Sequence, residues 1–362
     1  MLPTPPPSAS AAAKVFPWRP CILAAILFML GGCDPVAPIG EGPMEHRFGG
    51  HALGTEYLVK IITDDMLTPE EDEAISRAIM ETLEKVDNLM STYRPDAELY
   101  QFNASDSTDF QEISEETYTV FEIAMDVSER SGGAFDFTVG PLVNLWGFGP
   151  GGEAETLPPP EEEIEAARER VGYEQIELDP DTPAIRKTRP DVLCDLSGIA
   201  KGYATDAVAD ALEAEGFDRY MVSVAGEMRT RGHNQRDEPW RIAIERPDPG
   251  SRDIHAIVGL VDMTVATSGD YRQFFEHEGQ RYSHTIDPNT GWPVRHNLVS
   301  ASVIHNDNTY ADAWATALMV KGPGEGLALA EAEGLDAMLI TEVEDGVYEH
   351  ETTGDFDGYL LE

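Results

Sequence analysis

The segment Asp195–Asp206, with the sequence DLSGIAKGYATD, constrains the fold and chemistry of this chain more than any other. The apolar residues 192–194 before it predict a short strand, and Ser197 and Gly198 predict a turn. Apolar residues at helical spacing then predict a helix that ends at Gly216. The segment is therefore expected to join a strand to a helix through a tight polar turn.

Lys201 would lie in the first turn of this helix, where a cation opposes the helix dipole at a cost of a few tenths to about 1 kcal/mol. An anionic ligand would remove the conflict. Free N–H groups, a glycine and a lysine together suit a phosphate. The alternative is a plain strand-to-helix turn with a solvated lysine, and this segment alone leaves both interpretations open.

Composition limits the partners of the chain. Its 362 residues, 41% of them hydrophobic, suffice for one large domain or two smaller ones. The 67 acidic residues exceed the 25 basic ones, so the formal net charge is -42. Such a surface repels nucleic acid and anionic lipid, which are poor partners. The acidic residues are spread along the chain and indicate a solvated surface.

The N-terminal segment predicts export and lipid attachment. Its apolar stretch, Cys21–Leu30, follows two basic residues and is too short to span a bilayer. Small residues before Cys33 resemble a bacterial lipobox, so we expect a lipoprotein signal peptide over residues 1–32 and lipidation of Cys33. An ordinary signal peptide with a chance cysteine is the alternative. Asp34 resembles an inner-membrane retention signal, and residues 33–45 predict a flexible tether.

Apolar periodicity along the rest of the chain predicts an α+β fold with antiparallel sheet, because several strands follow one another between helices. Helices are expected over about 69–90, 115–130, 160–171, from 310 onward and over 324–333, and strands over 55–63, 220–224, 240–245, 256–261, 299–304 and 337–341. Cys194 lies in an apolar run and is expected in the core.

Two further patterns carry candidate chemistry. Asp312 and Thr316 are four residues apart on a predicted helix, so their oxygens face the same way and suit a hard cation such as Mg²⁺. The alternative is an Asp near a helix N-terminus and a packed Thr. His284 precedes a Pro/Asn/Gly turn and could accept a proton near neutral pH. It could equally form a hydrogen bond at a strand end.

Three loop segments are open to more than one interpretation. Gly132–Pro141 and Trp146–Pro150 are rich in glycine and aromatic residues, so they could line a flat ring or simply anchor loops. Ser268 and Asp270 could cap a helix. The sequence has no Walker A loop and no GxSxG motif.

Eight segments, taken in order, resemble the ApbE family of FAD:protein FMN transferases. They are LGT at 53–55, MSTYRPDAEL at 90–99, SGGAFDFTVGPL at 131–142, DLSGIAKGY at 195–203, VSVAGE at 222–227, ATSGDY at 266–271, SHTIDP at 283–288 and ADAWATA at 311–317. The resemblance implies an ApbE-like domain over residues 46–362, with an α+β, T-fold-like architecture and FAD in a central cleft.

The resemblance also implies roles for matching residues. FAD contacts are implied for Leu53, Tyr93, Ala134, Phe135, Asp136, Asp195, Lys201 and Ile286. A metal site is implied at the carbonyl of Gly198, Asp312 and Thr316, with Ala315 nearby, and His284 is the implied base. The chain departs from the family pattern at Leu53, where Met is usual, and at Ala225, where Gly is common.

The implied reaction moves FMN from FAD to a Thr or Ser hydroxyl of an acceptor protein and releases AMP, with Mg²⁺ as cofactor. The implied acceptors are subunits of membrane electron-transfer complexes of the RnfG or NqrC kind, or periplasmic flavoproteins. A lipid anchor in the inner membrane, with the protein facing the periplasm, would concentrate such partners.

Three alternatives remain at this point. Water in place of the acceptor hydroxyl would make the same site an FAD pyrophosphatase. A flavin-binding lipoprotein that stores or delivers FAD, or an electron carrier, would do no such chemistry. The pair Asp312 and Thr316 argues against pure binding, since holding a flavin ring needs no metal.

Overall fold

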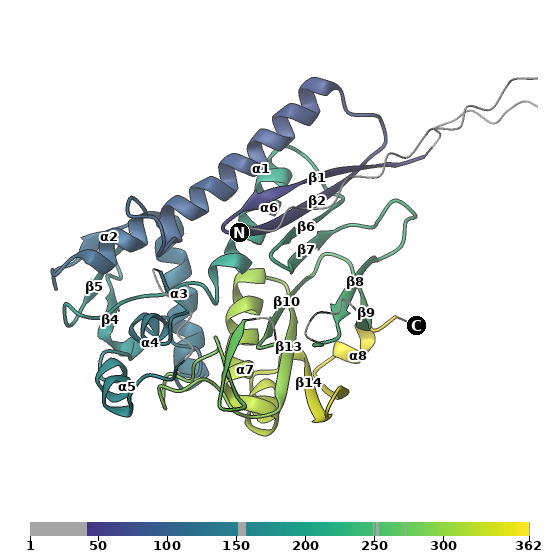
Figure 1. Cartoon of the computed structure of the whole chain (residues 1–362). Helices are drawn as coiled ribbons and strands as arrows, with labels where there is room; N and C mark the ends of the chain where they lie inside the picture. Colours follow the sequence, from purple (N-terminus) through teal and green to yellow (C-terminus); the bar gives the residue numbers. More distant parts are fainter. Residues whose placement is uncertain (1–41, 151–156, 249, 251–252, 272, 362) are drawn as a thin grey trace, which may run out of the picture. The chain divides into compact units, whose positions relative to one another are not determined.

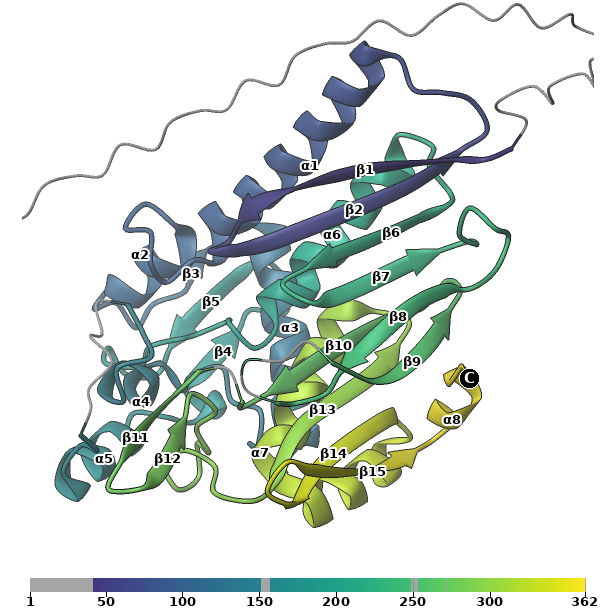
Figure 2. The same cartoon turned by 45° about the vertical axis from the view of Figure 1, so that its right-hand side comes forward.

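The computed structural model describes residues 42–150, 157–248, 250, 253–271 and 273–361. The expected signal peptide, Cys33 and most of the expected tether lie outside these residues. An antiparallel sheet of eight strands, in the order β1-β2-β6-β7-β10-β13-β14-β15, organises the described chain (Figures 1 and 2). The strands are β1 Met44–Ala52, β2 Thr55–Thr63, β6 Tyr220–Val224, β7 Glu227–Arg231, β10 Thr264–Gly269, β13 Leu298–His305, β14 Asp336–Glu344 and β15 Val347–Thr353. The predicted α+β class is confirmed.

Helices cover one face of this sheet (Figure 2). They are α1 Pro69–Met90, α6 Ala200–Ala214 and α7 Asn308–Glu333, with α3 Glu115–Arg130 packed against α7. α1 begins with a capping box, in which Thr68 accepts from the Glu71 N–H and the Glu71 carboxylate accepts from the Thr68 N–H. Its predicted apolar stripe is buried in the core beneath the sheet at Ile75, Ile79, Leu83, Val86 and Met90.

The opposite face of the sheet carries a second core. A hairpin of β8 Trp240–Glu245 and β9 Ile254–Leu260 packs there with α8 Phe356–Tyr359. Strand alternation feeds both cores: Tyr220 and Val222 of β6 point to the helices, whereas Met221 joins the hairpin.

The remaining elements lie beside the sheet. Their helices are α2 Glu98–Ala104, α4 Gly140–Leu145, α5 Glu161–Arg168 and the short 3-10 helix Tyr173–Gln175. Their strands are β3 Gln111–Glu112, β4 Ile176–Leu178, β5 Ala184–Lys187, β11 Phe274–His277 and β12 Gln280–Ser283. Of these, α2, β4 and β5 pack on the first core, whereas α4, α5 and the β11–β12 hairpin build a third, aromatic core. Trp146 stacks on Tyr282, which stacks in turn on Phe275, and this links α4 to the β11–β12 hairpin.

Two local expectations need correction. The tether boundary at residue 45 is two residues too late, because Met44 and Glu45 already pair with β2. Residues 192–194 form no regular strand: Leu193 makes a single bridge, and the Asn103 amide bonds both the N–H and the carbonyl of Cys194 at 2.8 Å. The two helices expected after residue 310 are confirmed: α7 consists of two helical pieces separated at Gly322, which has a non-helical φ of 78°.

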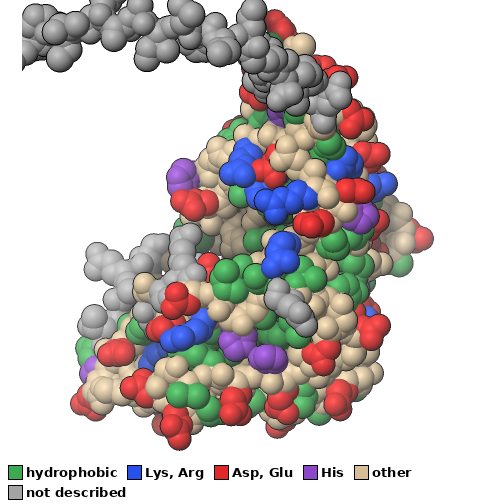
Figure 3. Space-filling model, turned by 90° about the vertical axis from the view of Figure 1, so that its right-hand side faces the viewer, with side chains coloured by type: hydrophobic (Ala, Val, Ile, Leu, Met, Phe, Trp, Pro, Cys, Tyr) green, Lys and Arg blue, Asp and Glu red, His purple; other side chains and the backbone are tan. Residues whose placement is uncertain are grey.

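Acidic side chains are spread over the face shown in Figure 3, with basic side chains among them. This distribution agrees with a solvated surface. Within the described residues, no helix combines the length and the apolar character needed to cross a membrane. Cys194 is buried, as expected.

Candidate active site

The turn before α6 presents the first helical N–H groups to the interior. The Asp195 carboxylate accepts a hydrogen bond from the Ser197 N–H at 2.9 Å, which closes the turn. The N-cap residue, Ile199, has no side-chain oxygen, and α6 therefore has no side-chain cap of its own. The Ala200 N–H bonds the Leu196 carbonyl of the turn at 2.8 Å, whereas the Gly202 N–H needs a partner from elsewhere in the fold.

Lys201 lies at the centre of a cluster of oxygens. Its ammonium is 3.0 and 3.1 Å from the two carboxylate oxygens of Asp312, 3.0 Å from the Ser197 carbonyl and 3.3 Å from Glu227 Oε1. Burial opposes the charged form, but Asp312 and Glu227 outweigh it and raise the pKa of Lys201. The lysine is protonated, and carboxylates of the protein offset its conflict with the helix dipole.

Asp312 joins α7 to the start of α6. It is fully buried, and its Oδ2 accepts from the Gly202 N–H at 2.9 Å, so a residue of one helix caps the other. A Cβ at Gly202 would clash with the backbone oxygen of Asn308 and approach Asp312 Cβ to 2.8 Å. Only glycine permits this close approach of the helices. Gly202 was not among the residues singled out from the sequence.

The other expected metal residues gather beside Asp312. Thr316 Oγ1 is 3.1 Å from Ser268 Oγ, and a Cβ at Gly198 would lie 3.2 Å from that same Thr316 oxygen. Gly198 therefore packs directly against Thr316. Ala315, between the two polar residues of α7, is fully buried.

These groups suit a hard cation in their chemistry. Asp312 offers a carboxylate, Thr316 a hydroxyl and the turn before α6 backbone carbonyls, and oxygen ligands are what Mg²⁺ prefers. Glu227 Oε2 is a buried oxygen without a hydrogen-bond partner. In the described part of the chain no three His, Cys, Asp or Glu side chains gather as a metal site, so a cation here would depend on hydroxyl and carbonyl ligands.

Glu227 is a site residue that sequence reasoning missed. It opens β7, is 2% exposed and contacts Lys201. Burial raises the pKa of Glu227 to about 7, although Lys201 opposes that rise. The available signal was an acidic residue directly after a strand and a turn. That turn places Ala225 and Gly226 at positive φ, 59° and 110°.

His284 is held as a neutral imidazole. Its Nδ1 is 3.2 Å from the Gln273 carbonyl, so Nδ1 carries the hydrogen and Nε2 keeps a lone pair. Burial lowers the pKa of His284, and the charges of Lys201 and Arg281 lower it further against the Gln273 carbonyl. A neutral histidine with a free nitrogen is suited to accept a proton.

Two of the expected flavin-contacting residues, Tyr93 and Ile286, lie in the neighbourhood of this histidine. Phe148 contacts the His284 ring edge-on, and Tyr93, which is 65% exposed, donates its hydroxyl to the Phe148 carbonyl at 3.3 Å. Burial and the charge of Asp195 raise the pKa of Tyr93. Ile286 follows in the chain and is buried in the aromatic core.

The other expected flavin contacts lie in turns and loops. Leu53 is in the β1–β2 turn, next to the β6–β7 turn, where the Ala225 N–H bonds the Glu56 carbonyl at 3.0 Å. Ala134 and Phe135 are buried, and Phe135 packs beside Gly198.

Asp136 differs from its neighbours because its carboxylate is already engaged. It accepts from the Thr138 N–H and hydroxyl, at 2.8 and 2.6 Å, and from the Tyr173 N–H at 2.9 Å. The flavin and metal roles of all these residues stay predictions.

Comparison with known proteins shows to which family this architecture belongs. The model of the ApbE family matches residues 53–339. An FAD:protein FMN transferase of Vibrio cholerae serotype O1 is 40% identical over 330 residues, which cover 91% of this chain and 95% of the relative.

Solved structures agree. The flavin transferase ApbE from Vibrio cholerae superposes with a TM-score of 0.80 at 38% identity, covering 88% of this chain and 100% of that chain. The apo form of the Pseudomonas stutzeri flavinyl transferase ApbE gives 0.79 at 37% identity, covering 88% and 97%. Fold and site together define an enzyme of the flavin transferase class. The chain belongs to the ApbE family.

Proposed function

We propose that this chain transfers FMN from FAD to a Thr or Ser hydroxyl of an acceptor protein, at the place where Lys201, Asp312 and His284 come together. One observation carries the proposal: the Lys201 ammonium lies 3.0 Å from the fully buried carboxylate of Asp312, one turn before Thr316, which packs against Gly198. A fixed cation and a base are what phosphoryl transfer requires of the protein.

Asp312, the Thr316 hydroxyl and the Gly198 carbonyl are the groups that would hold Mg²⁺. When bound, Mg²⁺ supplies positive charge that neutralises the pyrophosphate of FAD. Lys201 keeps Glu227 and the Ser197 carbonyl as partners if it shares Asp312, so its ammonium stays in the site. Tyr93 and Phe148 border the same site and would contact the flavin.

His284 would take the proton of the acceptor hydroxyl at Nε2. The hydroxyl oxygen attacks the phosphorus on the FMN side of FAD, and a new P–O bond forms. The bond from that phosphorus to the bridging oxygen breaks, and AMP leaves with that oxygen. The acceptor then carries FMN as a phosphoester, and the histidine must lose its proton before the next turnover.

The location of the protein and its acceptor are also proposed, and both are inferred from the sequence. We infer a lipid anchor at Cys33 in the inner membrane, with the protein facing the periplasm. Subunits of RnfG or NqrC type, or periplasmic flavoproteins, would be the acceptors. The anchor would raise the local concentration of membrane-bound acceptors.

Product analysis tests the proposal. The soluble chain is incubated with FAD, Mg²⁺ and an acceptor of RnfG or NqrC type, and the intact mass of the acceptor is measured. We expect a gain of one FMN less water, with AMP in equal amount. Release of free FMN and AMP without a gain in mass would instead establish an FAD pyrophosphatase. Recovery of intact FAD with every acceptor tried would contradict both.

A further inference from the structure

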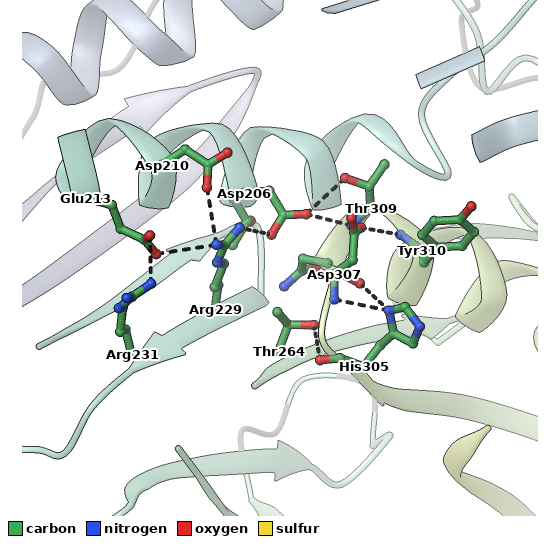
Figure 4. Close-up of polar contacts among 12 residues, drawn as sticks. Asp206, Asp210, Glu213, Arg229, Arg231, Thr264, His305, Asp307, Thr309 and Tyr310 are labelled. Carbon is green, nitrogen blue, oxygen red and sulfur yellow. Dashed lines mark hydrogen bonds and ion pairs between the residues drawn. The ribbon is translucent and has the colours of Figure 1, made fainter. Parts of the chain in front are cut away.

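A carboxylate of each of the helices α6 and α7 caps the N-terminal turn of the other. Asp312 of α7 accepts from the Gly202 N–H of α6 at 2.9 Å. In return, Asp206 of α6 accepts from both the N–H and the hydroxyl of Thr309, in the first turn of α7, each at 2.9 Å (Figure 4). Two carboxylates therefore fix one helix against the other.

Strand β7 of the sheet also binds both helices. Arg229 of β7 donates to Asp206 Oδ1 at 2.9 Å. Asn308, the first residue of α7, donates its side-chain amide to the Met228 carbonyl of the same strand at 2.7 Å. The start of α7 is thus tied to both α6 and β7.

Asp206 is not needed to start α7. The N-cap residue Asp307 already accepts from the Tyr310 N–H at 3.0 Å (Figure 4). Asp206 is only 7% exposed, and burying a carboxylate is costly unless it is paired and hydrogen-bonded. A second, buried carboxylate at this helix end therefore has a role other than forming the helix.

The contacts of Asp206 indicate that it fixes the position of α7. Thr309 lies one turn before Asp312 and two turns before Thr316, and a shift of α7 at Thr309 displaces both. The close contact at Gly202 means that even a small shift of α7 changes how Asp312 meets Lys201.

We propose that Asp206 is a positioning residue for the flavin transferase site, which it serves by holding α7 so that Asp312 and Thr316 face Lys201 and Gly198. The inference rests on the proposed function, because the metal-holding role of Asp312 belongs to it. Asp206 itself touches none of the reacting groups in this account.

The test compares Asp206→Asn with a matched control, Glu213→Gln. Glu213 is on the same helix, pairs with Arg229 at 3.4 Å and Arg231 at 2.7 Å, and is at the far end from α7. Mn²⁺ is the probe, and its affinity for each purified full-length variant is measured by the EPR signal of free Mn²⁺. Thermal unfolding is recorded in parallel.

We expect Asp206→Asn to weaken Mn²⁺ binding at least fivefold, and Glu213→Gln to leave it within twofold of the wild type. Asp206→Glu restores the charge but adds a methylene, so it should bind Mn²⁺ as weakly as the Asn variant. If Asp206→Asn does not fold, Thr309→Val removes one of the two hydrogen bonds from Thr309 and should give a smaller loss in the same direction.

Unchanged Mn²⁺ affinity in Asp206→Asn, or an equal loss in Glu213→Gln, would overturn the positioning role and leave the proposed function intact. Wild-type Mn²⁺ affinity in Asp206→Glu would show that the charge of residue 206 matters rather than its position. That result would also overturn the positioning role. A wild-type chain that binds no Mn²⁺ would overturn the metal assignment first, and this inference with it.

Discussion

Lys201 shows how its tertiary setting changes the meaning of a residue. The sequence indicated an anionic ligand as the group that relieves a cation at a helix N-terminus. In the structure Asp312 and Glu227 already provide that relief. A phosphate bound here would therefore share the lysine with two carboxylates, which makes the site depend on further positive charge.

Replacing His284 by Ala tests the assignment of the base. The variant should retain its affinity for FAD, measured by flavin fluorescence, and transfer FMN roughly 10²–10⁴-fold more slowly. His51→Ala, an exposed position in β1, is the control and should behave as the wild type. An equal loss of FAD affinity would make His284 a binding residue instead.

Asp136 predicts a pH dependence of stability. Burial raises the pKa of Asp136 from 3.8 to about 6, although hydrogen bonds from Thr138 and Tyr173 oppose the rise. The folded chain then binds this proton more tightly than the unfolded chain, so stability falls as pH rises from about 4 to about 6.

Asp136→Asn removes that titration. Denaturant unfolding should show the stability difference, wild type minus variant, decreasing by up to about 3 kcal/mol between pH 4 and pH 7. A difference that stays constant or grows over this range would show that the carboxyl is not shifted upward.

At the scale of elements, regular local patterns were predictable and long-range ones were not. α1 and α3 could be predicted because apolar spacing and caps lie within each segment. Residues 192–194 look like a strand, yet the Asn103 side chain takes the place of a neighbouring strand. These hydrogen bonds come from a residue far away in the chain, so local sequence could not predict them.

The residues of the candidate site likewise include some that the sequence predicted and some that it did not. Gly198 packs against Thr316, one turn along α7 from Asp312, and their role in holding a metal stays a prediction. Gly202 and Glu227 were missed because their roles arise where α6, α7 and β7 approach one another. The glycine directly after Lys201 was the local hint for Gly202, since glycine is unfavourable inside a helix unless packing requires it.

Gly202→Ala tests that approach of α6 and α7. The added methyl group has to push the helices apart, so we expect a loss of about 1–3 kcal/mol in the free energy of unfolding and impaired FMN transfer. Gly324→Ala, in α7 with open space around it, is the matched control. It should lose no stability, because the added methyl group meets no neighbouring atom. A neutral Gly202→Ala would contradict the close packing.

At the scale of the whole molecule, the class of fold followed from the order of strands and helices and from the family motifs. What the sequence could not specify was the layering, in which helices cover one face of the sheet and the β8–β9 hairpin covers the other. That choice depends on which strand residues point to which side, and pairs such as β2 with β6 and β10 with β13 join strands that are far apart in the chain.

The anchor is tested in cells. Cys33→Ser should move the protein from the membrane fraction to the soluble periplasmic fraction, because the acyl chains that hold it would be absent. Immunoblots of both fractions give the readout. Continued membrane partition of the variant would contradict lipidation at Cys33.

The measurement that tests the account most directly is single-turnover FMN transfer by Asp312→Asn at saturating Mg²⁺, followed by the intact mass of the acceptor. Asp210→Asn, on the exposed side of α6, is the control. The account predicts that Asp312→Asn transfers FMN at least roughly 10²-fold more slowly, as expected when a charge-stabilising group is lost, while Asp210→Asn keeps the wild-type rate. Transfer by Asp312→Asn at the wild-type rate would contradict the site described for this chain.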